Sequence, residues 1–287
     1  MLISLNMPAK LIDGKALAEK ILLELKPKIA NLKRPPGLAA ILIGDDPASL
    51  LYIKNKKIAC EKIGLNFHAY FCGNKISPNI TEGQIIETIS RLNNNPAIDG
   101  IIVQLPIPKK FDTEKITSQI KLEKDVDGFN RQKSLKNLGT DTLISPPLID
   151  AVNLVLTETK KDFQNKTAVI LCKNPIFSEP MKKSLAEIGL NVKIVKPEKN
   201  FSASTKKADV LIVILGKKYF VKKNMVKPEA IVIDIGTNLS GENKWAGDVD
   251  SKVAQIASFI TPVPGGIGPL TVAMLIKNVY QLALKNQ

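Results

Sequence analysis

Strand-like and helix-like segments alternate along most of this chain. Apolar runs typical of strands occupy residues 38–44, 67–72, 100–105, 167–172, 192–195, 210–215 and 231–235. Segments with helical periodicity lie between and after them, at 16–31, 49–63, 82–93, 148–157, 179–188 and 270–284. The alternation predicts an α/β fold, because crossover helices join parallel strands. The strand-like runs are continuously apolar, which indicates sheets covered on both faces.

The pattern also suggests a division into two domains. Regular periodicity fades between Asp127 and Pro147, and Pro147 suits the first turn of the next helix. We therefore expect an N-terminal α/β domain with a parallel sheet, formed by residues 1–147 and 271–287, and a Rossmann-type domain formed by residues 148–270. A cleft between two such domains is a common ligand site.

The net charge of +14 does not indicate a nucleic-acid partner. Only three of the 41 basic residues are arginine, the residue that nucleic-acid readers favour, and the lysines are spread along the whole chain. The charge can still attract an acidic small molecule. Three widely spaced cysteines and one histidine leave little material for a metal site, and free thiols suit a reducing cytosol. No apolar run reaches the ~20 residues that span a bilayer, so we expect a cytoplasmic protein without a membrane partner.

Tyr52 and Lys56 lie four residues apart, just after the strand-like segment 38–44. On a helix this spacing places both side chains on one face. A phenol beside an amine at the carboxyl end of a strand lies where α/β proteins keep their chemistry. The alternative is a solvated lysine and a half-buried tyrosine on an ordinary amphipathic helix.

Three further segments carry a polar side chain or a cluster of glycine and proline where a ligand could bind. Gln104 ends a buried strand, where its amide can orient an amine or a ligand, or simply cap the strand end. Asp127 precedes a glycine turn and can accept paired N–H donors from a heterocycle, or can form a plain Asp-Gly turn. Residues 261–271 combine three glycines with three prolines, which allows close approach of a ligand to the backbone or makes a tight connector.

Taken together, these segments closely resemble the bifunctional methylenetetrahydrofolate dehydrogenase/methenyltetrahydrofolate cyclohydrolase (FolD) family. The resemblance covers nearly the whole chain from Asp13 onward. It is carried by Gly44–Ser49 with Tyr52 and Lys56, by Asp99–Pro106, by Lys124–Phe129 and by Thr261–Thr271. In such enzymes methylenetetrahydrofolate gives a hydride to NADP, and water then opens the methenyl cation to formyltetrahydrofolate.

The resemblance implies roles for individual residues. Lys56 would be the catalytic amine, Tyr52 would lie over the folate, Gln104 would hold and tune Lys56, and Asp127 would grip the pterin. A cationic methenyl group disfavours an ammonium beside it, which lowers the lysine pKa toward neutrality. The other substrate-binding residues implied are Pro264, Gly265, Gly266 and Thr271. The cofactor-binding residues implied are Cys172, Lys173, Asn174, Ile235, Gly236 and Thr237. The resemblance also implies a homodimer formed through the second domain, and no metal.

The cofactor half departs from the family pattern. Cys172 and Ser178 replace two glycines, and Glu179 adds a negative charge where we expect the helix to start and a pyrophosphate to bind. Lys196–Asn200 replaces Cys-His-Ser-x-Thr, and Ile144–Pro147 replaces Pro-Cys-Thr-Pro, whereas Asp234–Asn238 and Gly247–Asp250 are kept.

Three hypotheses therefore stay open. The first is a bifunctional enzyme with a weak or altered cofactor site, and the second is a cyclohydrolase that has lost hydride transfer. The third is a folate-binding protein without catalysis, which the presence of Lys56, Gln104 and Asp127 disfavours. The strength of the family resemblance favours the first.

Overall fold

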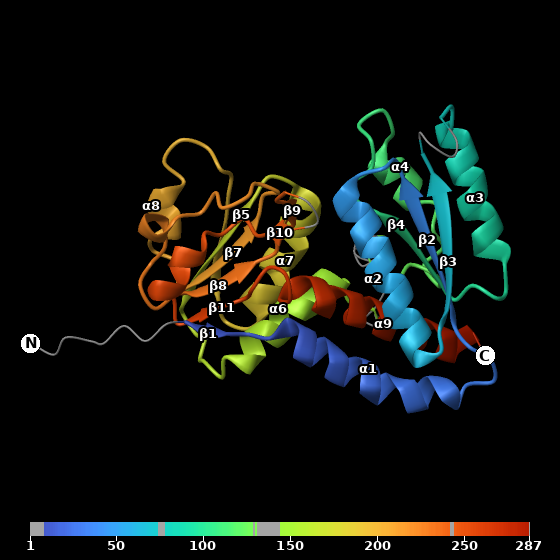
Figure 1. Ribbon diagram of the computed structural model, residues 1–287, viewed down its shortest axis with the longest axis horizontal. Coiled ribbons are helices and arrows are strands. Elements are labelled where there is room, and N and C mark those ends of the chain that lie inside the picture. Colours follow the sequence, from blue (N-terminus) through green and yellow to red (C-terminus); the bar gives the residue numbers. More distant parts are fainter. Residues whose placement is uncertain (1–8, 74–77, 129, 131–143, 242–243, 287) are drawn as a thin grey trace, which may run out of the picture. The chain divides into compact units, whose positions relative to one another are not determined.

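The computed structural model describes residues 9–73, 78–128, 130, 144–241 and 244–286. They fall into two compact units (Figure 1). The first unit comprises residues 18–147 and 271–287, and the second comprises residues 1–17 and 148–270. Each unit contains a parallel sheet with helices, which confirms the predicted two-domain α/β architecture.

The N-terminal segment belongs to a different unit from the one we expected. Strand β1 (Lys10–Leu11) pairs in parallel with β11 (Phe259–Ile260), and the backbone N–H of Ala9 donates to the carbonyl of Ala254. This pairing groups residues 9–17 with the second sheet rather than with the first. Strands of two residues are too short to show periodicity, so the sequence pattern could not reveal them.

The first unit contains a three-stranded parallel sheet in the order β3-β2-β4. Its strands are β2 (Gly37–Ile43), β3 (Asn66–Cys72) and β4 (Gly100–Gln104). Helices α3 (Glu82–Asn94) and α4 (Thr113–Thr117) pack against one face of the sheet through a shared apolar cluster. Helix α2 (Pro47–Ile63) lies on the other side (Figure 1).

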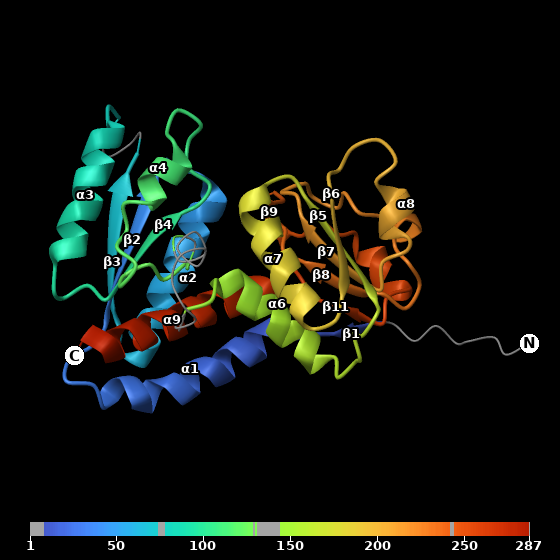
Figure 2. The same ribbon diagram turned by 180° about the vertical axis from the view of Figure 1, so that it is seen from behind.

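The second unit contains a six-stranded parallel sheet in the order β1-β11-β8-β7-β5-β6. Its longer strands are β5 (Thr167–Cys172), β6 (Asn191–Val195), β7 (Val210–Ile214) and β8 (Ile231–Asp234). Helices α6 (Pro147–Glu158) and α7 (Pro175–Glu187) cover one face, as Figure 2 shows. The other face carries the core beneath α8 (Ser202–Thr205), η1 (Lys223–Met225) and η2 (Ser251–Gln255).

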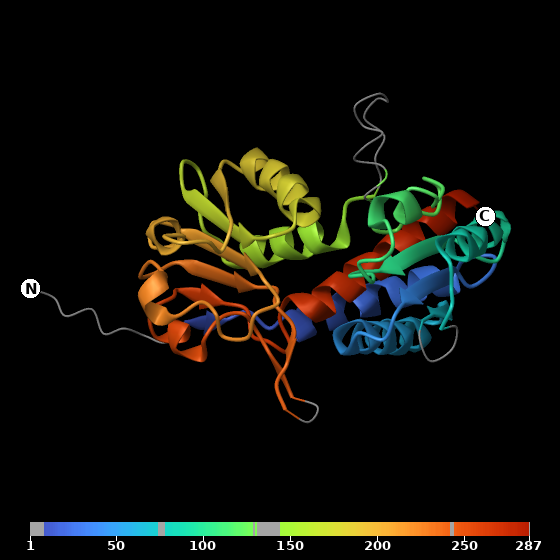
Figure 3. The same cartoon turned by 90° about the horizontal axis from the view of Figure 1, so that it is seen from above.

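A small antiparallel hairpin follows β8 and was not predicted. Its strands are β9 (Asn238–Leu239) and β10 (Trp245–Ala246), and Figure 3 shows it projecting from the second unit. The edge strands β3 and β6 also differ from expectation. Both expose several side chains, so burial on both faces does not hold for these two strands, whereas the edge strand β4 is buried throughout.

Two long helices complete the fold. Helix α1 covers Gly14–Ala30 and helix α9 covers Ile267–Asn286. Length and apolar composition alone would allow α9 to cross a membrane. However, 61% of that apolar window is buried inside the protein, as is usual for a core helix of a folded domain.

Candidate active site

Lys56 and Gln104 form a buried pair in the first unit. Lys56 belongs to the inward face of α2, together with Ile53 and Cys60, and only 4% of it is exposed. Gln104 is the last residue of β4 and pairs in register with Leu42. Since alternate strand residues point to opposite faces, Gln104 faces α2, away from α3 and α4. The Lys56 Nζ donates to Gln104 Oε1 at 2.6 Å.

The Gln104 amide is fixed in one orientation. Its Nε2 donates to the carbonyl oxygen of Leu105 at 2.8 Å, so Oε1 is the atom presented to the amine. A neutral amide oxygen accepts a hydrogen bond without adding a full negative charge. Gln104 therefore holds the amine in place without turning it into half of an ion pair.

Burial lowers the pKa of Lys56 to about 8, because the apolar surroundings disfavour the ammonium. The nearby Asp127 carboxylate acts in the opposite direction and raises it. An amine with a pKa near 8 can release and recover a proton under physiological conditions. The structure thus contains a buried amine with a lowered pKa at Lys56, and its catalytic role stays a prediction.

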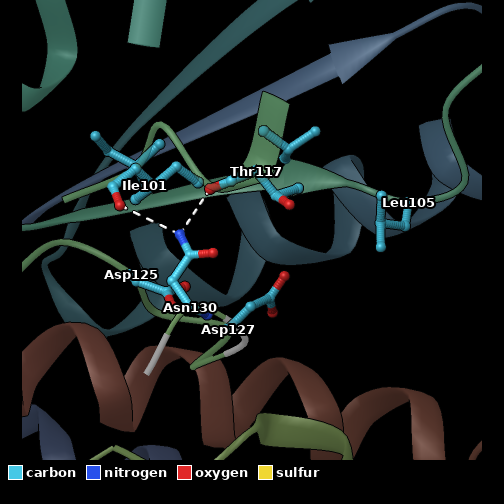
Figure 4. Close-up of a pocket in the computed structure, with 8 residues that line it drawn as sticks. Ile101, Leu105, Thr117, Asp125, Asp127 and Asn130 are labelled. Carbon is cyan, nitrogen blue, oxygen red and sulfur yellow. Dashed lines mark hydrogen bonds between the residues drawn. The ribbon is translucent and has the colours of Figure 1, made fainter. Parts of the chain in front are cut away.

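Asp127 lies in a turn beside the end of the sheet and is only partly exposed. Burial raises the pKa of its carboxyl to about 7, and Lys56 acts against that rise. Asp127 lines a small pocket in the first unit, which Figure 4 shows. The other lining residues come from β4 and from the segment that carries α4: Ile101, Val103, Leu105, Thr117, Ile120, Asp125 and Asn130. Lys56 interacts with Gln104 through a hydrogen bond and with Asp127 through charge, and the functional roles of all three residues stay predictions.

The turn that carries Asp127 is built by a residue that sequence reasoning passed over. Asp125 is buried, and its carboxylate accepts hydrogen bonds from the backbone N–H groups of Gly128 and Asn130. The Asn130 amide then donates to the carbonyl oxygens of Thr117 and Ile120 (Figure 4). An Asp three residues before a glycine is a typical turn signal, so this role could have been found in the sequence.

Tyr52 lies one turn before Lys56 on α2 and is half-buried. Asp46 caps this helix by accepting the N–H of Ser49, and Pro47 opens it. The hydroxyl of Ser49 is buried and has no hydrogen-bond partner within the described part of the chain. Asp46 and Pro47 set the start of the helix, and this start fixes where Tyr52 and Lys56 project.

The glycine–proline run makes a close backbone contact inside the second unit. A Cβ on Gly14 would lie 1.9 Å from the carbonyl oxygen of Gly266, and the Lys15 N–H donates to the carbonyl of Gly265 at 2.9 Å. Gly265 has a φ of +105°, a conformation that disfavours other residues. Pro264 is exposed and Thr271 is half-buried. The glycines thus have a packing function, and the substrate contacts of this run stay a prediction.

The expected cofactor residues lie at the carboxyl ends of β5 and β8. Lys173 and Asn174 follow β5 and are exposed, whereas Cys172 is buried. The Asn174 side chain caps α7 by accepting the N–H of Ile176 at 3.0 Å. Gly236 is buried, with Ile235 and Thr237 on either side of it half-buried.

One prediction about this region is wrong. Helix α7 begins at Pro175, so Glu179 lies in its second turn and not at its start. Asn174 followed by Pro175 is a standard signal for a helix start, and it placed the boundary four residues earlier than the apolar periodicity suggested. Glu179 therefore does not stand at the positive end of the helix. Among the described residues, no group of three His, Cys, Asp or Glu could hold a metal ion.

Comparisons with known proteins agree along the chain. Residues 12–127 match the catalytic domain of the tetrahydrofolate dehydrogenase/cyclohydrolase family, and residues 146–287 match its NAD(P)-binding domain. The bifunctional protein FolD of Nautilia profundicola is 41% identical over 281 residues, covering 95% of this chain and 96% of that protein.

Solved structures agree as well. The FolD methylenetetrahydrofolate dehydrogenase/cyclohydrolase of Campylobacter jejuni superposes with a TM-score of 0.87 at 38% identity, covering 97% of this chain and all of that one. The enzyme of Trypanosoma brucei, complexed with NADP cofactor and inhibitor, gives a TM-score of 0.88 at 30% identity, covering 97% and 98%.

Proposed function

Because this chain belongs to the tetrahydrofolate dehydrogenase/cyclohydrolase family, we propose that the Lys56–Gln104 pair is the centre of its folate chemistry. The protein is a methylenetetrahydrofolate dehydrogenase and methenyltetrahydrofolate cyclohydrolase of one-carbon metabolism. The observation that carries the residue assignment is a buried ε-amine, 2.6 Å from an amide oxygen, with a pKa lowered to about 8.

Lys56 serves the hydrolytic step as a proton carrier. Water adds to the methenyl carbon, and the neutral amine takes the proton that the water loses. The resulting ammonium returns that proton to the leaving ring nitrogen as the carbon–nitrogen bond breaks. The carbinol oxygen releases its remaining proton to solvent as the carbonyl forms, which yields formyltetrahydrofolate. A cationic substrate lowers the lysine pKa further, so the substrate itself favours the neutral amine that the step requires.

The other residues of the first unit hold the substrate. Asp127 accepts hydrogen bonds from the N–H groups of the pterin, for which its partly buried carboxylate and its electrostatic interaction with Lys56 suit it. Tyr52 packs its ring over the folate from the same helix as Lys56. Gln104 positions the amine through its amide oxygen.

The second domain binds NAD(P), and we propose NADP as the cofactor. When bound, this cofactor accepts a hydride from the methylene carbon. The start of the 13-residue helix α7 directs its positive end toward the carboxyl edge of the sheet, and the exposed Lys173 adds a cation there. These features fit a pyrophosphate, although Cys172 and Ser178 replace family glycines and are expected to weaken its binding.

A direct assay tests both reactions, the oxidation by NADP and the hydrolysis. Purified protein is mixed with methylenetetrahydrofolate and NADP, and NADPH formation and loss of the methenyl absorbance are followed separately. We expect both signals. Hydrolysis of added methenyltetrahydrofolate without NADPH formation would leave a cyclohydrolase that has lost hydride transfer, and binding without either reaction would leave a folate-binding protein.

Cofactor binding is tested independently of turnover. Thermal stability is measured against NADP and NAD, and saturable stabilisation follows RT ln(1 + [L]/Kd). No response at about 1 mM of either cofactor would remove the proposed NADP site.

We also propose that the protein is a cytoplasmic homodimer joined through the second domain. The hairpin of β9 and β10 offers the exposed Leu239 as an apolar side chain that such an interface would cover. One chain has a mass of 31.3 kDa. Light scattering at micromolar concentration is expected to give about twice that mass, and a monomer would contradict the proposal.

A further inference from the structure

Two buried carboxylates lie beneath the carboxyl edge of the second sheet, and none of the roles above uses them. Asp234 ends β8 and is 3% exposed, and Asp248 follows β10 and is fully buried. Asp234 accepts from the backbone N–H groups of Gly236, Asp248 and Val249. Asp248 accepts from the backbone N–H groups of Leu215, Gly216 and Lys217 and from the Asn238 side-chain amide.

Two glycines make this arrangement possible. A Cβ on Gly236 would lie 2.1 Å from the Asp248 carboxyl carbon, and a Cβ on Gly247 would lie 1.9 Å from Asp234 Oδ2. Asp248 thus lies against Gly236, which is close to Asp234 in sequence, and Asp234 lies against Gly247, which precedes Asp248. The close approach ties the loop after β8 to the segment after β10 as a single unit.

The pair fixes the two loops at the carboxyl ends of β7 and β8. Asp248 holds residues 215–217 after β7, while Asp234 holds Gly236, between two of the residues expected to bind the cofactor. Ligands of parallel α/β sheets bind outside the carboxyl ends of the strands. The carboxylates therefore set the backbone on which one part of the cofactor would lie.

The direction of these hydrogen bonds decides which part of the cofactor can lie on the two loops. The N–H groups of residues 215–217 and of Gly236 point at carboxylates, so they are not available to an anion. Buried negative charge also repels a pyrophosphate. The pyrophosphate is thereby directed to the start of α7, and the edge formed by β7 and β8 is left to the nicotinamide end. The oxidised nicotinamide ring carries a positive charge, and the reduced ring carries none.

We propose that Asp234 and Asp248 are positioning residues for hydride transfer, which shape the nicotinamide side of the cofactor site and favour the oxidised ring over the reduced one. The inference rests on the proposed NADP site in the same domain. Burial raises the pKa of Asp234 to about 7, while the N–H groups of Val249, Asp248 and Gly236 lower it. Asp248 accepts from four N–H donors, three from the backbone and one from Asn238, and they hold its carboxylate in place.

The test compares affinities for NADP and NADPH. Trp245 is the only tryptophan and lies in the hairpin next to Asp248, so its fluorescence offers a binding signal. Asp248→Asn is expected to weaken NADP binding by ~10-fold and to lower the preference for NADP over NADPH by about threefold or more. Circular dichroism measures the fraction of folded protein. A role in folding alone would weaken both cofactors equally.

Asp209→Asn is the matched control. Asp209 precedes β7 at the opposite, amino end of the same sheet and accepts from the Thr167 N–H and from Lys227. Its replacement is expected to leave the ratio of the two affinities unchanged.

Asn238→Ala provides a second variant with the opposite sign. It removes one donor from Asp248 and leaves the carboxylate charge less compensated, so the preference for NADP should rise. The Asn238→Ala variant tests the inference even if the Asp248→Asn protein does not fold. An unchanged affinity ratio in a folded variant would overturn the inference. Failure of the unmodified protein to bind either nucleotide would instead overturn the proposed NADP site.

Discussion

Two buried sites in this protein, one in each unit, treat charge in opposite ways. In the first unit, one buried amine donates to a single amide oxygen, and its pKa moves to about 8. In the second unit, two buried carboxylates accept from six backbone N–H groups and one side-chain amide. The first arrangement leaves a group that exchanges protons easily. The second surrounds its groups with donors and uses them to hold backbone in place.

This difference suggests how to separate chemistry from support in a newly met α/β protein. A buried titratable group with few partners is costly to charge, and that cost is what makes it useful in proton transfer. A buried carboxylate enclosed by N–H donors is held by them and acts on its surroundings through position and field. The predictions below test whether each region behaves as its hydrogen bonds indicate.

The largest effect is expected at the amine. Lys56→Met removes the proton carrier while keeping an unbranched side chain of similar length, so methenyltetrahydrofolate hydrolysis should fall by about 10²- to 10⁴-fold. The fold should survive, because a buried cation is costly and an apolar chain is not. Stopped-flow loss of the methenyl absorbance measures the rate, and circular dichroism verifies the fold.

The neighbouring Lys57→Met is the control for this change. Lys57 is exposed on α2, and its Nζ lies 3.8 Å from Glu61 Oε1. Its loss should leave hydrolysis unchanged. Retained turnover in folded Lys56→Met protein would remove Lys56 from the mechanism.

A smaller loss is expected when the pterin contact is removed. Asp127→Asn replaces an acceptor oxygen with a donor, and folate affinity should fall by ~10- to 100-fold. Because burial raises the pKa of Asp127 to about 7, the unmodified protein should also bind folate more weakly as the pH falls through 7 and the carboxylate gains a proton. Calorimetric titration between pH 6 and 8 measures both effects.

Glu123→Gln is the matched variant for Asp127. Glu123 is exposed in the same stretch of chain, so its replacement should not change the dissociation constant. An unchanged folate affinity in Asp127→Asn would refute the pterin contact.

Because Gln104 is uncharged, replacing it with an acid tests the direction in which the pKa of Lys56 is shifted. With a neutral amine as the proton acceptor, hydrolysis should rise with pH and level off near or below pH 8. Gln104→Glu places a carboxylate beside the amine and favours the ammonium, so the rise should move to higher pH by about one unit. The rate at pH 7 should fall ~10-fold and recover at pH 9. A pH profile that does not move would show that Gln104 does not tune Lys56.

Much of this molecule could be predicted from its sequence because the relevant patterns are local. Continuous apolar runs and helical periodicity predicted the long strands and helices, and the motifs predicted which residues of α2 and β4 would meet. The pairing of Lys56 with Gln104 depends on strand alternation, which places Gln104 on the α2 face together with Leu42.

The features that were missed depend on contacts distant in sequence or on very short segments. Strands β1 and β11 have two residues each, and β1 gains its partner from nearly 250 residues away. The donors of Asp248 come from strand β9 and from the loop after β7, 10 and about 30 residues earlier in the chain. The start of α7 is different, because its signal was present in Asn174 and Pro175 and was outweighed by apolar spacing.

The smallest effect is expected at the loop after β5, where we propose that Cys172 weakens the cofactor site. Cys172 is buried, and its thiol donates to the carbonyl of Asn174 at 3.3 Å. Cys172→Gly removes a side chain from the place where a phosphate would approach the backbone, but it also increases the freedom of the unfolded chain. We expect NADP to bind about two- to fivefold more tightly, with cyclohydrolase activity unchanged.

Ser178→Gly sharpens this test. Ser178 is buried inside the first turns of α7 and donates to the Asn174 carbonyl, so glycine there costs helix stability without exposing more backbone to a ligand. If the lost loop glycine is what weakens the cofactor site, Cys172→Gly tightens NADP and Ser178→Gly does not. Equal affinities in all three proteins would mean that Lys173 and the start of α7 determine cofactor binding.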